Sequence, residues 1–243
     1  MTDTTPEAAA AEEPLYLYID LETPGLEPKL GILEVGWKLT KDLASFGGND
    51  APVFAMLASV NVELAYESAA PFVREMHTKN GLWEELKDHD QVVPLFVIEQ
   101  EILRQVGNHQ GPLYLVGNGI RMDRAFIEKW MPALDQRLHY RQIDLTSVWL
   151  FLQGVGLDIP KASSEGTHRV IDDVRNSILN AIRLGKEVKE RAKASFLNGP
   201  AGGREILLKR QPKKLDLGGW RYVRIDDPDT GESLGAYAYA PVQ

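Results

Sequence analysis

The chain has 243 residues, of which 44% are apolar and 26% are charged, so it can bury a core as one large domain or as one domain with an appendage. It contains no cysteine, which excludes disulfides, thiolate catalysis and cysteine-based zinc sites, and its net charge of −8 argues against nonspecific binding along a nucleic acid duplex. The sequence has no signal-peptide pattern and no long apolar run, so we expect a cytoplasmic protein with no membrane partner.

The first part of the chain combines an acidic tail with three strand-like runs. Residues 1–13, MTDTTPEAAAAEE, carry a charge of −4 and few large apolar side chains, so we expect a disordered acidic tail there. Apolar and β-branched runs follow at 16–20, 32–40 and 54–62, and turn-rich segments separate them. This pattern predicts a meander at the start of a sheet.

The middle of the chain alternates helical patterns with short strands. The helical patterns are ESAAPFVREM (67–76), GLWEELK (81–87), VVPLFVIEQEILRQVG (92–107), MDRAFIEKWM (122–131) and TSVWLFLQGVG (146–156). Strands are predicted at 112–118 and 140–145. A periodic helix is predicted from residue 169 to about residue 194, with one apolar face made of Val170, Val174, Ile178 and Ile182. Together these elements predict an α/β fold with a mixed sheet.

The last segment, residues 195–243, has a different character. FLNGPAGG is predicted to be a linker, and WRYVRIDDPDTGESLGAYAYA alternates around the turn signal DPDTG, which predicts a β-hairpin. Residues 203–224 carry seven basic and two acidic side chains. Two interpretations stay open: this segment extends a path for nucleic acid, or it is a small β extension that packs on the body or on a partner.

Two carboxylates stand at an unusual place in the first strand, YLYIDLE. Residues two apart in a strand point to the same face, so Asp20 and Glu22 are predicted to project side by side. A buried pair of carboxylates needs a cation or a shared proton, because two desolvated negative charges repel each other. The alternative is that the strand ends at Ile19 and both acids lie in a solvated turn before Pro24.

Further acids and one histidine occur at the ends of other predicted elements. Asp123 follows a buried strand at the start of a helix, and His168 precedes a helix whose first turn contains Asp172 and Asp173. Each has an ordinary explanation, because acids are favoured at helix N-termini and a lone histidine is usually structural. As a set they also meet the needs of a two-metal phosphodiester hydrolase. Such an enzyme needs oxygen ligands for hard divalent ions and a base for the attacking water.

The order of these motifs resembles the DEDDh family of 3′→5′ exonucleases, and within it the oligoribonucleases. The resemblance covers residues 14–185 and rests on six stretches in the order of the family: IDLETPGL, ILEVGW, MHTKNGLWEEL, GNGIRMDRAFI, HYRQIDLTS and GTHRVIDDVRNSI. It implies a ribonuclease-H-like mixed sheet flanked by helices over 14–194. Residues 195–243 then form a linker and a small C-terminal β extension.

The resemblance also implies roles for individual residues in the site. Asp20, Glu22, Asp123 and Asp173 would bind two divalent ions, Mg²⁺ or Mn²⁺, and His168 would be the general base. The His-x-x-x-x-Asp spacing selects Asp173 over its neighbour Asp172, which is left to cap the helix or face solvent.

The resemblance assigns substrate contacts to five further residues. Leu26 would separate the last two bases, His77 would stack on the terminal nucleotide, and Tyr140 would stack on a base. Arg141 and Thr146 would bind phosphate, supplied with Tyr140 by the second subunit of a homodimer. Ordinary explanations remain, namely packing in a turn for Leu26, a structural role for His77 and a solvated strand edge for Arg141.

Two departures from the family pattern affect the predicted substrate range. A serine of the family is Gly119 here, and an expected polar residue is Leu150. We therefore expect a broader preference for short strands than strict specialisation on dinucleotides. The predicted activity is a two-metal-ion 3′→5′ exoribonuclease that releases nucleoside 5′-monophosphates from short single-stranded RNA, with DNA left open. The alternatives are a DNA-directed proofreading or repair exonuclease and a catalytically silent nucleic-acid-binding module.

Overall fold

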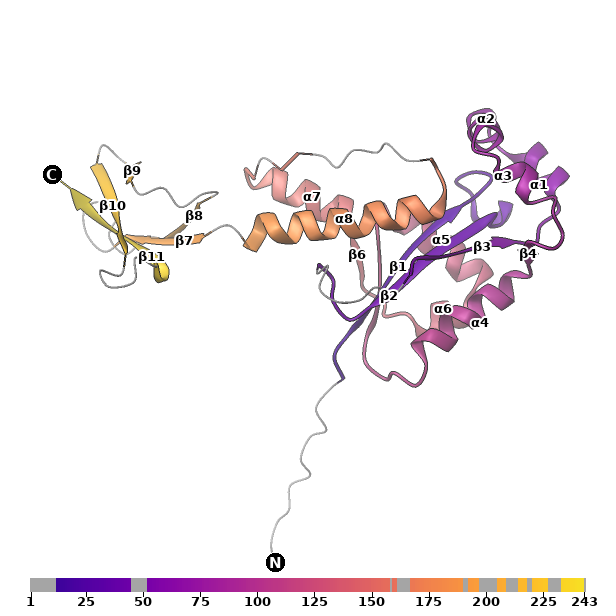
Figure 1. Ribbon diagram of the computed structural model, residues 1–243, viewed down its shortest axis with the longest axis horizontal. Coiled ribbons are helices and arrows are strands. Elements are labelled where there is room, and N and C mark those ends of the chain that lie inside the picture. Colours follow the sequence, from indigo (N-terminus) through magenta and orange to yellow (C-terminus); the bar gives the residue numbers. More distant parts are fainter. Residues whose placement is uncertain are drawn as a thin grey trace, which may run out of the picture. The chain divides into compact units, whose positions relative to one another are not determined.

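The computed structural model describes residues 12–44, 52–157, 159–160 and 167–189, together with the strand residues of the C-terminal part at 192–196, 205–208, 214–217, 220–226 and 233–242. The chain divides into two compact units, Met1–Ile182 and Arg183–Gln243 (Figure 1). Most of the tail predicted over 1–13 lies outside the described residues. Glu12 is described, and its carboxylate accepts hydrogen bonds from the backbone N–H groups of Gln110 and Gly111.

The first unit is built on a mixed six-stranded sheet with the order β4-β3-β2-β1-β5-β6. Its strands are β1 (Leu15–Glu22), β2 (Glu34–Thr40), β3 (Phe54–Ala58), β4 (Val92–Val93), β5 (Leu113–Gly117) and β6 (Gln142–Asp144). The first three strands pair antiparallel, which is the predicted meander. The other three join in parallel, so the predicted mixed α/β sheet is confirmed.

Helices cover both faces of this sheet (Figure 1). Helices α4 (Leu95–Val106) and α6 (Pro132–Arg137) lie below it in the view, and α8 (Val170–Lys189) lies above it. The remaining helical segments are η1 (Pro28–Leu30), α1 (Val62–Ser68), α2 (Pro71–Lys79), α3 (Leu82–Glu85), α5 (Arg121–Trp130) and α7 (Leu145–Gly154). None of the helices that the structure describes has the length and apolar character needed to cross a membrane.

Strand β1 alternates between a core face and a polar face. Its odd-numbered residues, Leu15 to Leu21, belong to one buried cluster with side chains of α4, α5 and α6. The even-numbered residues therefore face the opposite side of the sheet, where α8 lies. Because β1 continues through Glu22, the alternative that the strand ends at Ile19 is wrong.

Several predicted boundaries shift for local reasons. The strand expected over 54–62 ends at Ala58, because Asn61 caps α1 by accepting a hydrogen bond from the N–H of Leu64. The helix expected over 67–76 is interrupted at Ala69 and Ala70, which are extended, because a residue before proline avoids helical angles and Pro71 begins α2.

The apolar face predicted for the last helix is partly wrong. Val170 and Val174 are fully buried, but Ile178 and Ile182 are only half-buried. The buried row continues instead through Ser177, Ala181 and Leu184. A step of four residues overshoots a helical turn by about 40°, so a row of such steps rotates away from the neighbouring sheet, whereas alternating steps of three and four stay in contact.

The C-terminal unit contains a five-stranded sheet with the order β8-β7-β11-β10-β9. The strands are β7 (Ala192–Phe196), β8 (Glu205–Leu208), β9 (Lys214–Leu217), β10 (Trp220–Asp226) and β11 (Ser233–Val242). The predicted hairpin is present as the antiparallel pair β10–β11, and three strands that the sequence pattern did not indicate join it. The turn DPDTG and all but the first residue of FLNGPAGG lie outside the described residues.

Candidate active site

Three carboxylates meet on the polar face of the sheet. Asp20 and Glu22 come from β1 and Asp173 comes from the first turn of α8, and one carboxylate oxygen of each lies within 4.8 Å of the other two. The helix reaches the strand because Val170 packs on Gly36, which pairs with Asp20 in the sheet. A Cβ at Gly36 would lie 2.6 Å from the Cβ of Val170, so this approach requires glycine.

A fourth carboxylate, Asp123, belongs to the same group. It lies in the first turn of α5, is 5% exposed, and its Oδ1 accepts a hydrogen bond from the backbone N–H of Leu21 at 3.1 Å. Leu21 lies between Asp20 and Glu22 in β1, so this bond fixes Asp123 beside them. Asp172, in contrast, accepts a hydrogen bond from the hydroxyl of Thr167 and lies 3.5 Å from Arg175.

Burial and mutual repulsion raise the pKa values of these four acids. Burial raises the pKa of Asp20 well above its ordinary value, and Asp123 and Asp173 raise it further. Burial and then Asp20 raise the pKa of Glu22 to about 9, while burial raises that of Asp123 to about 7. Burial also raises the pKa of Asp173. Such a group resists full ionisation without a cation, and its all-oxygen donor set suits a hard divalent ion.

His168 lies at the entry to α8, next to these carboxylates. Its side chain is exposed, and a positive charge on its ring would lower the pKa of Asp173. Its backbone φ is 52°, in the left-handed region that residues other than glycine rarely adopt. The structure therefore brings all five sequence-predicted metal and base residues to one end of the sheet.

A fifth buried carboxylate, Glu34, was missed by the sequence analysis. It pairs with Glu22 across β1 and β2 and is 3% exposed. The guanidinium of Arg169 donates to both of its oxygens, at 2.8 and 3.0 Å. The alternation of ILEVGW contained a weak signal, because Val35 and Trp37 face the core and Glu34 therefore stands on the same face of the sheet as Glu22.

His77 is buried beside Glu22, and its predicted stacking on a nucleotide stays a prediction. Its side chain is 0% exposed, its Nε2 lies 3.3 Å from Oε2 of Glu22, and its ring meets Trp83 edge-on at 5.7 Å. Burial lowers the pKa of His77 to about 4, so the imidazole is neutral near neutral pH and its contact with Glu22 is not an ion pair. In this structure His77 contacts Glu22, and its ring is enclosed by protein.

The other predicted substrate residues are exposed. Leu26, in the loop after β1, is 80% exposed. Tyr140 is 72% exposed, and the guanidinium of Arg141 lies over its ring at 4.4 Å. Thr146 is exposed in the first turn of α7, where its N–H donates to Asp144, the residue that caps this helix.

Asp144 links this second group to the acids, a connection that the sequence analysis did not identify. Its Oδ1 also accepts a hydrogen bond from the N–H of Gly119, in the segment that leads from β5 to Asp123. The two groups are therefore joined through neighbouring parallel strands. The structure gives no contact between Leu26 and the residues around Tyr140.

Comparison with known proteins places the chain in a family. No protein-family model matches the chain. The curated oligoribonuclease of Corynebacterium glutamicum (strain R) is 35% identical over 149 residues, which cover 60% of this chain and 65% of that protein. The oligoribonuclease of Francisella tularensis subsp. tularensis (strain FSC 198) is 31% identical over 169 residues, which cover 67% of this chain and 89% of that protein.

Solved structures share the fold at low sequence identity. Apo exonuclease I aligns with a TM-score of 0.52 and 11% identity, over 72% of this chain and 42% of that one. The zinc-bound form of the E. coli ExoI–ssDNA complex aligns with a TM-score of 0.51 and 10% identity, over 74% and 44%. These likenesses support the ribonuclease-H-like exonuclease fold. Because the match to the Francisella protein extends over nearly the whole of that relative, the chain belongs to the oligoribonuclease family of DEDDh exonucleases.

Proposed function

We propose that this protein is a metal-dependent 3′→5′ exoribonuclease that releases nucleoside 5′-monophosphates from short single-stranded oligonucleotides. The observation that carries the proposal is the carboxylate cluster, formed by Asp20 and Glu22 of β1, Asp173 of α8 and the anchored Asp123. The relatives named oligoribonuclease support RNA as the substrate class.

We assign Asp20, Glu22, Asp123 and Asp173 as the ligands of two divalent cations, Mg²⁺ or Mn²⁺. When bound, divalent cations neutralise charge on the attacked phosphate and lower the pKa of water. The four side chains supply only oxygen donors, which are the ligands that both ions prefer. The raised pKa values of the acids support this assignment, because a cation removes the repulsion that raises them.

His168 is proposed to take the proton from the attacking water. Its exposed imidazole belongs to the residue that leads into the helix of Asp173, and it is open to solvent, so it can pass the proton to bulk water after each turnover. His77 is not a candidate for this step, because burial lowers its pKa to about 4, which makes it a weak base, and its ring is enclosed beside Glu22.

Substrate binding is proposed to involve the exposed residues on either side of the cluster. Leu26 presents an apolar side chain to a base, and the stacked pair Tyr140–Arg141 presents an aromatic ring with a guanidinium, which suits a nucleotide. A few residues later in the chain, α7 and its C-cap carry the exposed apolar side chains of Val148, Leu150, Phe151 and Val155. We propose that these apolar side chains bind a second copy of the chain, so that Tyr140, Arg141 and Thr146 reach the partner's substrate.

The proposal is tested by product analysis on end-labelled RNA and DNA oligonucleotides of matched sequence, with Mg²⁺ or Mn²⁺ and with EDTA. We expect 5′-monophosphates released from the 3′ end, no activity in EDTA and no activity in Asp123→Ala. The exposed variant Asp90→Asn is the matched control and should keep wild-type activity. Faster cleavage of DNA than of RNA would support the DNA-directed alternative. Binding without any metal-dependent cleavage would support a silent module.

A length series in the same assay tests the predicted substrate range. Because Gly119 lacks a hydroxyl and exposed Leu150 replaces a polar residue, we expect rates on two-mers and seven-mers that differ by less than about a hundredfold. A larger preference for the two-mer would show that the missing donors do not matter.

A further inference from the structure

We propose that Arg169 and Asn80 are positioning residues that hold His168 in place from its two sides. The proposal rests on the proposed function, in which His168 is the base. The four residues Glu34, Asn80, Glu85 and Arg169 are called the histidine latch below. None of them was identified from the sequence, and none of them belongs to the carboxylate cluster.

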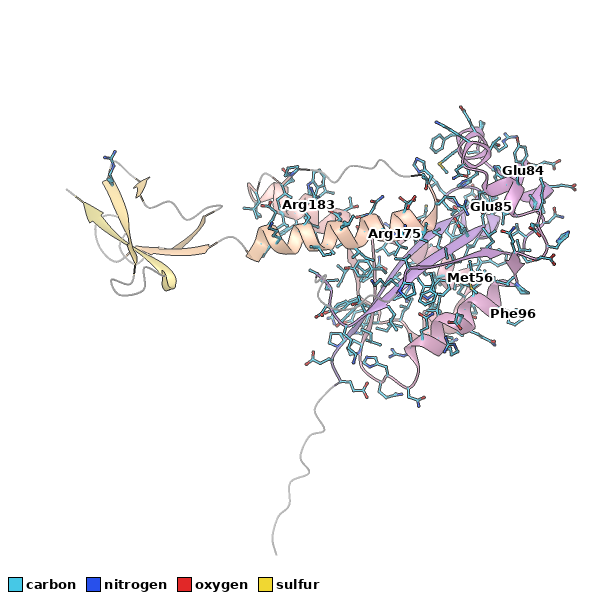
Figure 2. All side chains as sticks on the ribbon, in the orientation of Figure 1. Met56, Glu84, Glu85, Phe96, Arg175 and Arg183 are labelled. Atoms are coloured by element: carbon cyan, nitrogen blue, oxygen red, sulfur yellow. The ribbon has the colours of Figure 1, made fainter. Side chains whose placement is uncertain are left out.

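Arg169, which follows His168, is held by four charge-assisted hydrogen bonds. Its guanidinium donates to both carboxylate oxygens of Glu34 on β2, and to both of Glu85 on α3 at 2.7 and 2.9 Å. Its side chain is 19% exposed, so these bonds are largely shielded from solvent. Figure 2 shows Glu85 beside the end at which α8 begins.

Asn80, in the C-cap of α2, holds the other side of the histidine. Its Nδ2 donates to the backbone carbonyls of Thr167, at 3.1 Å, and His168, at 2.7 Å. Its Oδ1 accepts from the N–H of Leu82 in the first turn of α3, so the amide group is itself fixed. Both ends of the residue that carries the imidazole are therefore tied to the segment from α2 to α3.

The conformation of His168 shows why the latch is needed. A left-handed φ costs free energy in a residue with a side chain and persists only where surrounding contacts impose it. The two carbonyl bonds from Asn80 and the four bonds of Arg169 supply those contacts. Without them the chain would relax to an ordinary φ, and the imidazole would lose its fixed position at the start of α8.

The latch also aligns the helix that carries Asp173. The carbonyl of Arg169 accepts hydrogen bonds from the N–H groups of Asp172 and Asp173, and the N–H of Val170 lies 3.4 Å from Oε2 of Glu34. Arg169 thus ties the start of α8 to β2, and the same bonds fix the backbone next to His168. Its loss should displace the base and disturb the first turn, while leaving the substrate surface at Leu26 and Tyr140 unchanged.

The first experiment separates turnover from binding with a short RNA substrate at saturating metal. For Arg169→Gln and Asn80→Ala we expect kcat to fall by about 10- to 100-fold, the range typical of a misplaced catalytic group, while KM stays within about threefold of wild type. The matched control is Arg104→Gln, which removes a similar two-bond pair with Glu101 on the exposed side of α4. It should leave both constants unchanged.

Two further variants separate position from charge. Arg169→Lys keeps the charge and loses the planar fork, and the double variant Glu34→Gln with Arg169→Gln leaves no unpaired buried carboxylate. If the latch positions His168, both remain at least about fivefold below wild-type kcat. Full recovery of kcat in either variant would overturn the positioning role, because charge neutralisation would then suffice.

The second experiment needs no metal and no turnover. Hydrogen exchange of metal-free protein should become faster over residues 168–174 in Arg169→Gln and Asn80→Ala, with no change over α4. Unchanged exchange over 168–174 would overturn the latch. Failure of the proposed function would look different, because the wild type would then show no metal-dependent cleavage even where the exchange result supports the latch.

Discussion

Asp172 and Asp173 are adjacent in one helical turn, yet only Asp173 lies in the carboxylate cluster. We expect Asp173→Asn to lower kcat/KM by at least about a hundredfold and to weaken Mn²⁺ binding, because it removes a proposed ligand. Asp172→Asn should keep activity within about threefold, because Asp172 contacts Thr167 and Arg175 instead. Steady-state kinetics and calorimetric titration with Mn²⁺ check both variants. The reverse order of effects would mean that the ligand is Asp172.

The raised pKa of Glu22 predicts how the stability of the metal-free protein depends on pH. Folded Glu22, with a pKa of about 9, holds a proton that the unfolded chain releases near its ordinary pKa of 4.5. The contribution of Glu22 to the stability of the folded state is therefore fully present below about pH 4.5, and it is lost as the pH rises through about 9.

We expect the unfolding free energy in EDTA to fall by at least about 2 kcal/mol between about pH 5 and about pH 9, since one pKa unit corresponds to about 1.4 kcal/mol. Urea unfolding across this range measures it. The matched variant Glu22→Gln should flatten the dependence, and added Mn²⁺ should oppose the loss. A stability that rises with pH in EDTA would contradict the burial of this acid.

At the scale of single residues, the sequence predicted the acids better than their surroundings. The two-residue spacing of Asp20 and Glu22 predicted that both side chains point to the same face of the sheet, because strand geometry alone determines this. The bond between Arg169 and Glu34 joins residues 135 positions apart, and no local pattern indicates which distant carboxylate a guanidinium will meet. The burial of His77 could not be predicted for the same reason, because it depends on Trp83 and Glu22 in the folded structure.

At the scale of elements, the contact of α8 with β2 depends on Gly36. We expect Gly36→Ala to destabilise the fold by about 1–3 kcal/mol, because the new Cβ would overlap Val170, and to lower activity by moving Asp173. The control Gly154→Ala, at the end of α7, meets no atom within 4 Å and should be neutral or slightly stabilising. Thermal unfolding and the nuclease assay measure both. An unaffected Gly36→Ala would show that α8 can dock without close approach.

The existence of the main elements was predictable, and their ends were less so. Periodicity identified α4 and α8 because long amphipathic segments must bury one side. The end of β3 and the start of α1 depend on the helix cap at Asn61, and this cap could not be recognised within a run of mostly apolar residues. The strands β7, β8 and β9 were missed because they are short and their partners lie elsewhere in the sheet.

At the scale of the whole molecule, the exposed face of α7 predicts self-association. Phe151 is 67% exposed and Leu150 is 56% exposed, which is unusual for neighbouring large apolar residues. We expect a dimer in sedimentation analysis and a monomer for Phe151→Asp, with kcat/KM on short RNA reduced by about tenfold or more if the partner supplies Arg141. The control Phe96→Asp changes an exposed phenylalanine on α4 and should stay dimeric. A monomeric wild type would exclude the shared site.

Strand β1 carries both the centre of the core and half of the proposed ligand set, on alternate residues. A slip of one position in its pairing would turn Asp20 and Glu22 into the aliphatic interior and would turn four leucine and isoleucine side chains toward the face that carries the carboxylates. A chain in the wrong register would therefore have side chains in unfavourable surroundings on both faces of the sheet. The pairing register of this one strand therefore also decides on which face of the sheet Asp20 and Glu22 stand.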